Sequence, residues 1–285
     1  MTVDSWRAHR SGVSSVDELV SVLAVERLSA TTFTGRSTSV PSHRVFGGQI
    51  LAQCAVAAAR TVAPPAVLHS VHAYFVRAAR PSVKFHFEVT TLRDGRSFAV
   101  RRIDVSQDDE IVTSMTASYQ VPEEGMAHQD VMPARPAAEE LAGRTPFYVA
   151  ADGPARAGAV ELRSCPPGSP GEPASSIWMR ITAPLPDDPL LHQAMLIYLS
   201  DFGIMHGAFQ HHDVDRTQVR SASLDHSMWL HRAGRADDWL LYESRSPSAA
   251  AARAMGQANL FTANGTLLAT ASQEMLVRRI TAPLH

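Results

Sequence analysis

The sequence predicts an α+β protein made of two similar halves, each a curled antiparallel sheet wrapped around a central helix. Two apolar stretches, residues 46–62 and 190–202, have almost no polar face, which is typical of a helix buried on all sides. Alternating segments typical of strands follow them at residues 67–77 and 218–232. A sheet packed on such a helix is a standard layered arrangement, and 285 residues suffice for about two such units.

Short matches between the halves indicate an internal duplication. Residues 115–118, Met-Thr-Ala-Ser, correspond to residues 269–272, Ala-Thr-Ala-Ser. The pairs Asp108-Asp109 and Asn264-Gly265 precede these segments and predict hairpin turns. Chance similarity between alternating strands is the alternative. The same order of helix and strands occurs twice, however, and this favours a repeat.

Proline-rich stretches divide the chain. Residues 122–145 lack strand alternation and contain three prolines, whereas residues 166–173 and 184–189 predict loops. We therefore expect three parts: an N-terminal unit over residues 15–122, a linker over 123–145 and a C-terminal unit over 146–282.

Composition excludes several classes of protein. A net charge of -2 provides no overall basic field for nucleic acid or an anionic membrane. No apolar run approaches the ~20 residues that span a bilayer, and the polar start, residues 1–12, does not resemble a signal peptide. The two cysteines, Cys54 and Cys165, provide neither a disulfide framework nor a zinc site. We expect a reduced, cytoplasmic protein.

An acidic residue interrupts an apolar helix face. Leu190, Ala194, Ile197 and Asp201 follow one another at helical spacing. A buried carboxylate costs several kcal/mol unless it is paired or hydrogen-bonded. Asp201 is therefore either a functional group at the edge of a pocket or a helix-end aspartate that turns to water.

The last strand of the chain carries a similar anomaly. Gln273 lies on a face whose other members are apolar, and a buried amide needs several hydrogen-bond partners. Those partners are either functional groups or a neighbouring part of the backbone. The matching position in the first half is Tyr119, so this polar feature exists in one half only.

The pattern of residues 218–230 does not decide which side chains face inward. A strand with period 2 places Ser223 and Asp225 on one face and His226 on the other. By this pattern either Asp225 or His226 faces inward, and Ser223 is either a solvated strand residue or part of a site.

Several motifs are absent. The chain has no G-x-S-x-G, no G-x-x-x-x-G-K-[ST] and no G-x-G-x-x-G, which removes the usual signals for a serine hydrolase and for nucleotide binding. A cluster of potential ligands matches no strong metal-binding spacing, so we predict a solvated loop and no metal or cofactor. It consists of His206, His211, His212 and Asp213.

A set of short strings resembles the acyl-CoA thioesterase II family. They are RVFGGQ at 44–49, HSVHAYF at 69–75, LRDGRSF at 92–98, MTASYQ at 115–120, LDHSMW at 224–229 and WLLY at 239–242. The resemblance covers about residues 20–280. It implies a double hotdog fold, in which two hotdog units share one chain, and a homodimer or homotetramer.

The resemblance also implies an active site in the second half. The family's aspartate, hydroxyl residue and glutamine fall on Asp201, Ser223 and Gln273. The family often has threonine where this chain has Ser223. The implied reaction is hydrolysis of an acyl-CoA to a free acid and coenzyme A, with Asp201 as general base and the other two residues orienting the water.

The sequence indicates the residues that contact the substrate less specifically than it indicates the catalytic residues. Gly47-Gly48 would allow a ligand to approach closely, and a group of arginines could bind the phosphates of coenzyme A or could simply be exposed. These arginines are Arg93, Arg96, Arg101 and Arg102. The acyl chain requires an apolar tunnel beside one of the helices.

Two other functions compete. Asp201 and His206 have the five-residue spacing found in some hotdog hydratases, but the Asn-Pro of that motif is missing. A non-catalytic acyl-CoA-binding protein on the same scaffold is the third hypothesis, and the intact set of three polar residues argues against it.

Overall fold

The computed structural model describes residues 15–37, 44–144, 158–167, 175–212 and 218–280. The predicted loop at 166–173, Asp213 and the polar N-terminus lie wholly or partly outside these ranges. Within them, the chain forms one long antiparallel sheet and a small number of helices.

The first half consists of helices α2 and α3 and six strands. Their bounds are α2 Ser15–Leu23, β1 Glu26–Arg27, β2 Thr32–Gly35, α3 Gly47–Ala59, β3 Val67–Phe75, β4 Phe85–Asp94, β5 Phe98–Gln107 and β6 Glu110–Gln120. Helix α3 is rich in alanine, and nearly all of its residues are buried. The predicted turn at Asp108-Asp109 joins β5 to β6, with both residues at positive φ.

The second half repeats this order. Its elements are β7 Val160–Ser164, β8 Ser175–Ile181, α4 Pro189–Ser200, α5 His206–Phe209, β9 Val219–Ser223, β10 Asp225–Leu230, β11 Leu240–Ala250, β12 Arg253–Thr262 and β13 Leu267–Arg279. Asp188 caps α4 by accepting hydrogen bonds from the N–H groups of Leu190 and Leu191. The predicted turn at Asn264-Gly265 joins β12 to β13.

The strand order makes the duplication visible. From the centre outwards, the first half runs β3-β6-β5-β4-β2-β1 and the second runs β10-β13-β12-β11-β8-β7. The two halves join where β3 pairs with β10. Each half thus places its strands in corresponding positions around its own central helix, α3 or α4, and the predicted α+β fold is confirmed.

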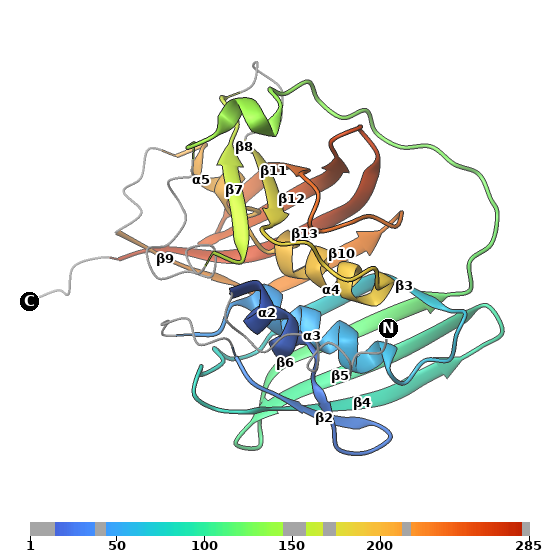
Figure 1. The fold of residues 1–285 in the computed structure, drawn as a ribbon. Helices are drawn as coiled ribbons and strands as arrows, with labels where there is room; N and C mark the ends of the chain where they lie inside the picture. The colour runs from blue at the N-terminus through green and yellow to red at the C-terminus, as the bar shows by residue number, and fades with distance from the viewer. Residues whose placement is uncertain (1–14, 38–43, 145–157, 168–174, 213–217, 281–285) are drawn as a thin grey trace, which may run out of the picture.

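The two central helices lie together in the middle of the molecule. Figure 1 shows α3 and α4 side by side, with the strands of the first half below them and those of the second half above. One apolar core includes residues from both halves, such as Leu51 of α3 and Ile197 of α4. The end of one helix and the start of the other therefore meet inside the protein.

The segment after β6 crosses from one half to the other. It contains no helix or strand up to the short 3-10 helix η1, Ala138–Leu141, and it forms a long arc in Figure 1. Arg135 attaches it to the second half through an ion pair with Glu243 at 3.2 Å, and both side chains are buried. The unit boundaries at 122/123 and 145/146 stay a prediction.

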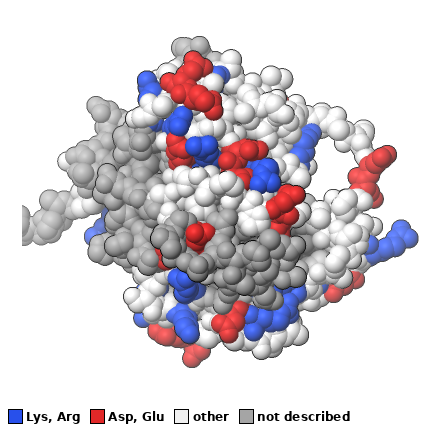
Figure 2. All heavy atoms as spheres, viewed as in Figure 1, with Lys and Arg blue, Asp and Glu red and all other residues white. Residues whose placement is uncertain are grey.

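Basic and acidic side chains are interspersed on the face shown in Figure 2. In the second half, for example, Glu161 pairs with both Arg163 at 2.6 Å and Arg180 at 2.8 Å. Over the described residues of this face, acidic side chains therefore lie among the basic ones. Among the described residues, no helix combines the length and the apolar composition needed to cross a bilayer.

One predicted strand is interrupted. Residues 218–230 form two strands, β9 and β10, and Leu224 lies between them. Both pair with β13, but from Ser223 to Ser227 the chain advances four residues while β13 advances three, from Met275 to Ser272. The extra residue acts as a β-bulge and reverses the alternation of side chains beyond it.

Candidate active site

Asp201, Ser223 and Gln273 come together around the side chain of Gln273. Gln273 lies on β13 and is fully buried, as the strand alternation predicts. Its Nε2 donates a hydrogen bond to Ser223 Oγ at 2.5 Å, and its side chain is close enough to Asp201 to lower the pKa of that carboxyl group. The amide of Gln273 therefore lies between the two other polar groups.

Asp201 occupies the junction of the two central helices. It is the C-cap residue of α4, directly after Ser200. Its Oδ2 accepts a hydrogen bond from the N–H of Gly48, in the first turn of α3, at 2.8 Å. A helix C-terminus disfavours a carboxylate, whereas a helix N-terminus favours one. The start of α3 therefore offsets the unfavourable position of Asp201 at the end of α4.

The glycine pair makes this junction possible. A Cβ on Gly47 would lie 2.8 Å from the ring of Phe75, and a Cβ on Gly48 would lie 2.6 Å from the carbonyl oxygen of Tyr198. The glycines do allow close approach, but the group that approaches Gly48 is the end of α4. The Gly48 N–H is used by Asp201.

The surroundings of Asp201 change its acidity. Burial raises the pKa of its carboxyl group above the usual range for aspartate, and this outweighs the opposite effects of His226, the Gly48 N–H and Gln273. A general base works best when its pKa is close to the operating pH. The shift is therefore in the direction that suits a base.

Ser223 reaches the site from the last position of β9. Its Oγ accepts the hydrogen bond from Gln273, which leaves its own proton available to another acceptor. Ser223 Oγ lies 4.0 Å from the sulfur of Met205, which is a weak contact. Only the resemblance to the family pointed to Ser223.

His226, one of the two residues that the sequence left open as facing inward, belongs to the same group. It is fully buried, and its Nδ1 lies 2.6 Å from Gln273 Oε1. Its Nε2 lies 2.8 Å from Ser200 Oγ, at the end of α4. Strand alternation placed Ser223 and His226 on opposite faces, whereas the bulge at Leu224 lets both reach Gln273.

Asp225 has a structural role instead. Its Oδ1 accepts a hydrogen bond from the backbone N–H of Glu274 at 2.6 Å. Of the two candidates left open by the sequence, His226 is the one that faces inward.

The first half has no equivalent cluster at the matching position. Tyr119 is buried there, and its hydroxyl lies 3.4 Å from the carbonyl oxygen of Ala55 in α3. The matching site is therefore filled by an aromatic side chain.

One proposed phosphate ligand has another function. Arg101 is buried and donates to backbone oxygens of Arg93 and Thr61, with an ion pair to Asp94 at 2.7 Å. Its guanidinium is used within the fold, so the prediction that it is free to bind a phosphate is wrong. Arg93, Arg96 and Arg102 are exposed.

The competing histidine site receives no support. His206 Nε2 lies 3.0 Å from Gln210 Nε2 within the α5 region, whereas Asp201 accepts a hydrogen bond from Gly48. Across the ranges that the structure describes, no group of three His, Cys, Asp or Glu side chains could hold a metal ion.

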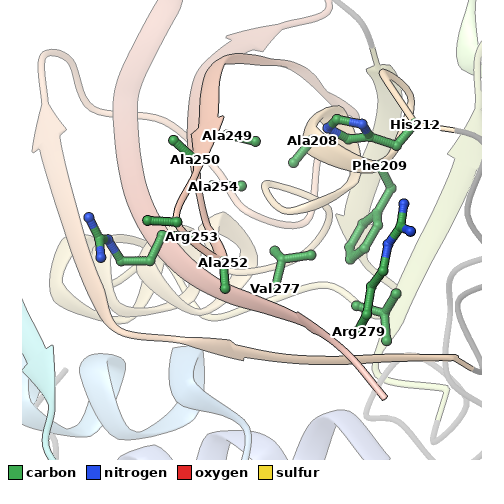
Figure 3. Close-up of a pocket in the computed structure, with 12 residues that line it drawn as sticks. Ala208, Phe209, His212, Ala249, Ala250, Ala252, Arg253, Ala254, Val277 and Arg279 are labelled. Carbon is green, nitrogen blue, oxygen red and sulfur yellow. The ribbon is translucent and has the colours of Figure 1, made fainter. Parts of the chain in front are cut away.

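A small apolar pocket lies close to the cluster. It has a volume of about 210 Å³ and is lined largely by alanines, with Val277 of β13 on one side and Phe209 beside α5. Figure 3 shows Arg253 and Arg279 at its edges. Met205 packs against the apolar group that includes the pocket residue Ala208, and Met205 also contacts Ser223. Met205 therefore contacts both the apolar group that includes a pocket residue and the polar cluster.

The two halves of the sheet, each curled on a helix, and the polar group in the second half define a double hotdog protein with an Asp–Ser–Gln site. Residues 36–120 match the acyl-CoA thioesterase N-terminal domain, and residues 160–276 match acyl-CoA thioesterase. The chain belongs to the acyl-CoA thioesterase family.

Individual relatives agree over nearly the whole chain. Acyl-CoA thioesterase 2 of Haemophilus influenzae is 31% identical, over 92% of this chain and 98% of that protein. Human acyl-coenzyme A thioesterase 8 is 33% identical, over 91% and 88%. The crystal structure of acyl-CoA thioesterase II TesB2 from Mycobacterium marinum superposes with a TM-score of 0.82 at 37% identity, over 92% and 98% of the two chains.

Proposed function

We propose that the protein hydrolyses acyl-CoA thioesters and that Asp201, Ser223 and Gln273 carry the reaction. The observation that supports this most directly is the position of the buried Gln273 amide, which donates to Ser223 and lowers the pKa of the neighbouring Asp201 carboxyl group. Isolated polar groups would be costly there. Membership of the acyl-CoA thioesterase family is the second support.

In this mechanism, a water molecule lies between Asp201 and Ser223. Asp201 accepts a proton from the water as its oxygen attacks the carbonyl carbon of the thioester. Ser223 and Gln273 orient the water, and such positioning of acid–base groups contributes typically 10²–10⁴-fold. The C–S bond then breaks, the sulfur of coenzyme A leaves with the bonding electrons, and the Asp201 proton passes to the products or to solvent.

The thiolate leaving group needs little help. A thiol of this kind has a pKa of about 8.5, so it leaves readily near neutral pH. The residues of the cluster therefore need to supply only a base and orientation, without a metal or an organic cofactor.

A thiol-release assay tests the proposal. Purified protein is given acyl-CoA substrates of increasing chain length, and free coenzyme A is measured with a thiol reagent. We expect turnover that saturates with substrate. Saturable binding without thiol release over hours would instead indicate a binding protein, and consumption of the double bond of crotonyl-CoA without thiol release would indicate a hydratase.

We also propose that copies of the chain associate as a homodimer or homotetramer. Large apolar side chains are exposed on strands near the middle of the sheet, including Tyr74 on β3 and Trp229 on β10. Exposed aromatic side chains of this kind are typical of interfaces. Light scattering of the purified protein tests this, and a Trp229→Arg variant is expected to shift the mass towards the monomer.

We further propose a cytoplasmic location and a role in fatty acid metabolism. Both cysteines are free, and Cys54 is buried in the core of the first half, as expected for a reducing compartment. Cell fractionation with an antibody to the protein tests the location. A free acid released from endogenous acyl-CoA in cell extract would support the metabolic role.

A further inference from the structure

His226 lies in the middle of a buried chain of hydrogen bonds that links helix α4 to the catalytic cluster. Ser200 Oγ lies 2.8 Å from His226 Nε2, and His226 Nδ1 lies 2.6 Å from Gln273 Oε1. Gln273 Nε2 then contacts Ser223 Oγ at 2.5 Å. Ser200, His226 and Gln273 are each no more than 1% exposed. Water therefore has little access to exchange for any of these partners.

The Gln273 amide has only one useful orientation in this chain. Its Nε2 donates to Ser223, and the same amide lowers the pKa of the Asp201 carboxyl group, as an N–H directed at the carboxylate does. If the amide turned over, its oxygen would face the Asp201 carboxylate, and two acceptors would oppose each other. The useful orientation points Oε1 towards His226, which must then supply the donor.

His226 supplies that donor when its single ring proton is on Nδ1. Nε2 then accepts from the hydroxyl of Ser200, whose oxygen lies 2.8 Å away. The Nδ1 proton is directed at Gln273 Oε1, at an Nδ1–Oε1 distance of 2.6 Å.

The end of α4 holds this arrangement in place. The hydroxyl of Tyr242, on β11, donates to the carbonyl oxygen of Ser200 at 2.5 Å. Ser200 precedes Asp201 in the chain, so the same turn positions both the base and the partner of His226. Both Asp201 and the hydrogen-bond partner of His226 are therefore positioned by the C-terminal end of α4.

We infer that His226 is a positioning residue that sets the orientation of the Gln273 amide, and through it the geometry of Ser223 and Asp201. The inference rests on the proposed hydrolytic function. His226 contacts no reacting atom; its contribution is to make one of the two amide orientations far more favourable than the other.

Three replacements of His226 separate this role from a purely structural one. His226→Asn retains an N–H donor near the Nδ1 position, whereas His226→Gln extends its amide towards Ser200, and His226→Leu has no polar group. We expect kcat to fall roughly 10²-fold for the Leu and Gln variants, the loss that misplacement of a catalytic group typically causes. We expect a fall of less than about tenfold for Asn and little change in KM throughout.

A double-mutant cycle with Gln273→Ala gives the second readout. If His226 acts through Gln273, then His226→Leu costs little more in kcat once the Gln273 amide is absent. His192→Leu is the matched control, because His192 is another buried histidine, bonded to the Ala236 N–H at the other end of α4. We expect His192→Leu to change stability but not kcat.

Several results would overturn the inference. Equal losses of kcat in the Asn and Leu variants would show that the donor at Nδ1 is not the cause. Fully additive effects of His226→Leu and Gln273→Ala on kcat would show that His226 acts independently of the amide. Circular dichroism and thermal unfolding of each variant establish that it folds. Absence of thiol release in the unmodified protein would refute the proposed function itself, which is a separate outcome.

Discussion

Gly48 and Asp201 are 153 residues apart in sequence, and the backbone N–H of the first donates to the carboxylate of the second at 2.8 Å. The bond links the first turn of α3 in one half to the C-cap of α4 in the other. The second half contributes the whole Asp–Ser–Gln group, but its base is held by the first half. If the proposed site is correct, both halves of the duplication contribute to it, because the carboxylate of the second half is bound by the first.

A methyl group at position 48 should disturb this junction. In Gly48→Ala the new Cβ would meet the Tyr198 carbonyl oxygen at 2.6 Å, so the two helices must separate. We expect the free energy of unfolding to fall by about 1–3 kcal/mol and kcat to fall as well, measured by urea unfolding and thiol release. Gly125→Ala is the control, because a Cβ there meets nothing within 4 Å; equal effects of the two changes would contradict the role of the junction.

Removal of the base or of the amide should stop the chemistry without unfolding the protein. We expect Asp201→Asn and Gln273→Ala each to lower kcat by about 10²-fold or more, within the range of acid–base catalysis. Tyr119→Phe, at the matching position of the first half, should leave kcat unchanged. Wild-type kcat in both site variants would remove the assignment of the active site.

The activity should depend on pH through Asp201. The base must be ionised, and burial raises the pKa of its carboxyl group. As the pH falls through this raised pKa, the fraction of active enzyme and kcat/KM should decline, at a higher pH than for an exposed aspartate. A pH profile of kcat/KM for one substrate measures this. A flat profile down to the usual aspartate range would show that another group is the base.

The same shift predicts a pH dependence of stability. A raised pKa means that the folded state binds this proton more tightly than the unfolded state does. Burial of Asp201 therefore destabilises the fold least at a pH below the pKa that the residue has in the unfolded state. The free energy of unfolding then decreases as the pH rises through the interval up to the folded pKa. Asp201→Asn should therefore be more stable than the wild type at neutral pH and lose that advantage in acid. Urea unfolding at neutral and at acidic pH measures the difference in stability. A variant that is less stable than the wild type at neutral pH would contradict this prediction.

The pocket beside α5 should accept part of the acyl chain. Its volume of about 210 Å³ is below the roughly 300–1,000 Å³ of a site for a drug-sized ligand, so it suits a segment of the chain. Ala249 lines it from an exposed position. Filling the pocket with Ala249→Phe should displace a few methylenes, at about 0.8 kcal/mol each, and lower kcat/KM about tenfold for long-chain substrates only.

A matched exposed alanine provides the control for that experiment. Ala127 lies in the segment after β6 and is exposed, so Ala127→Phe should leave the preference for chain length unchanged. If Ala249→Phe lowers kcat/KM equally for short and long substrates, the acyl chain does not extend into this pocket.

Local sequence patterns were sufficient for the features that depend on burial alone. The period of a strand is two, so one polar residue on an apolar face identified Gln273, and helical spacing did the same for Asp201. The two buried helices were predicted from their apolar composition, and the two hairpin turns from the residue types at the turns. In each case the relevant information lies within a few neighbouring residues.

The tertiary structure alone decided how these residues meet. The bulge at Leu224 arises because β9 and β10 pair with β13 in different registers, and a pattern within one strand cannot show it. The bulge brings both Ser223 and His226 to the face of the sheet on which the Gln273 side chain lies. Likewise, the Gly48–Asp201 bond depends on how two helices from opposite halves pack, since contacts between distant segments are set by the closure of the sheets and not by local spacing.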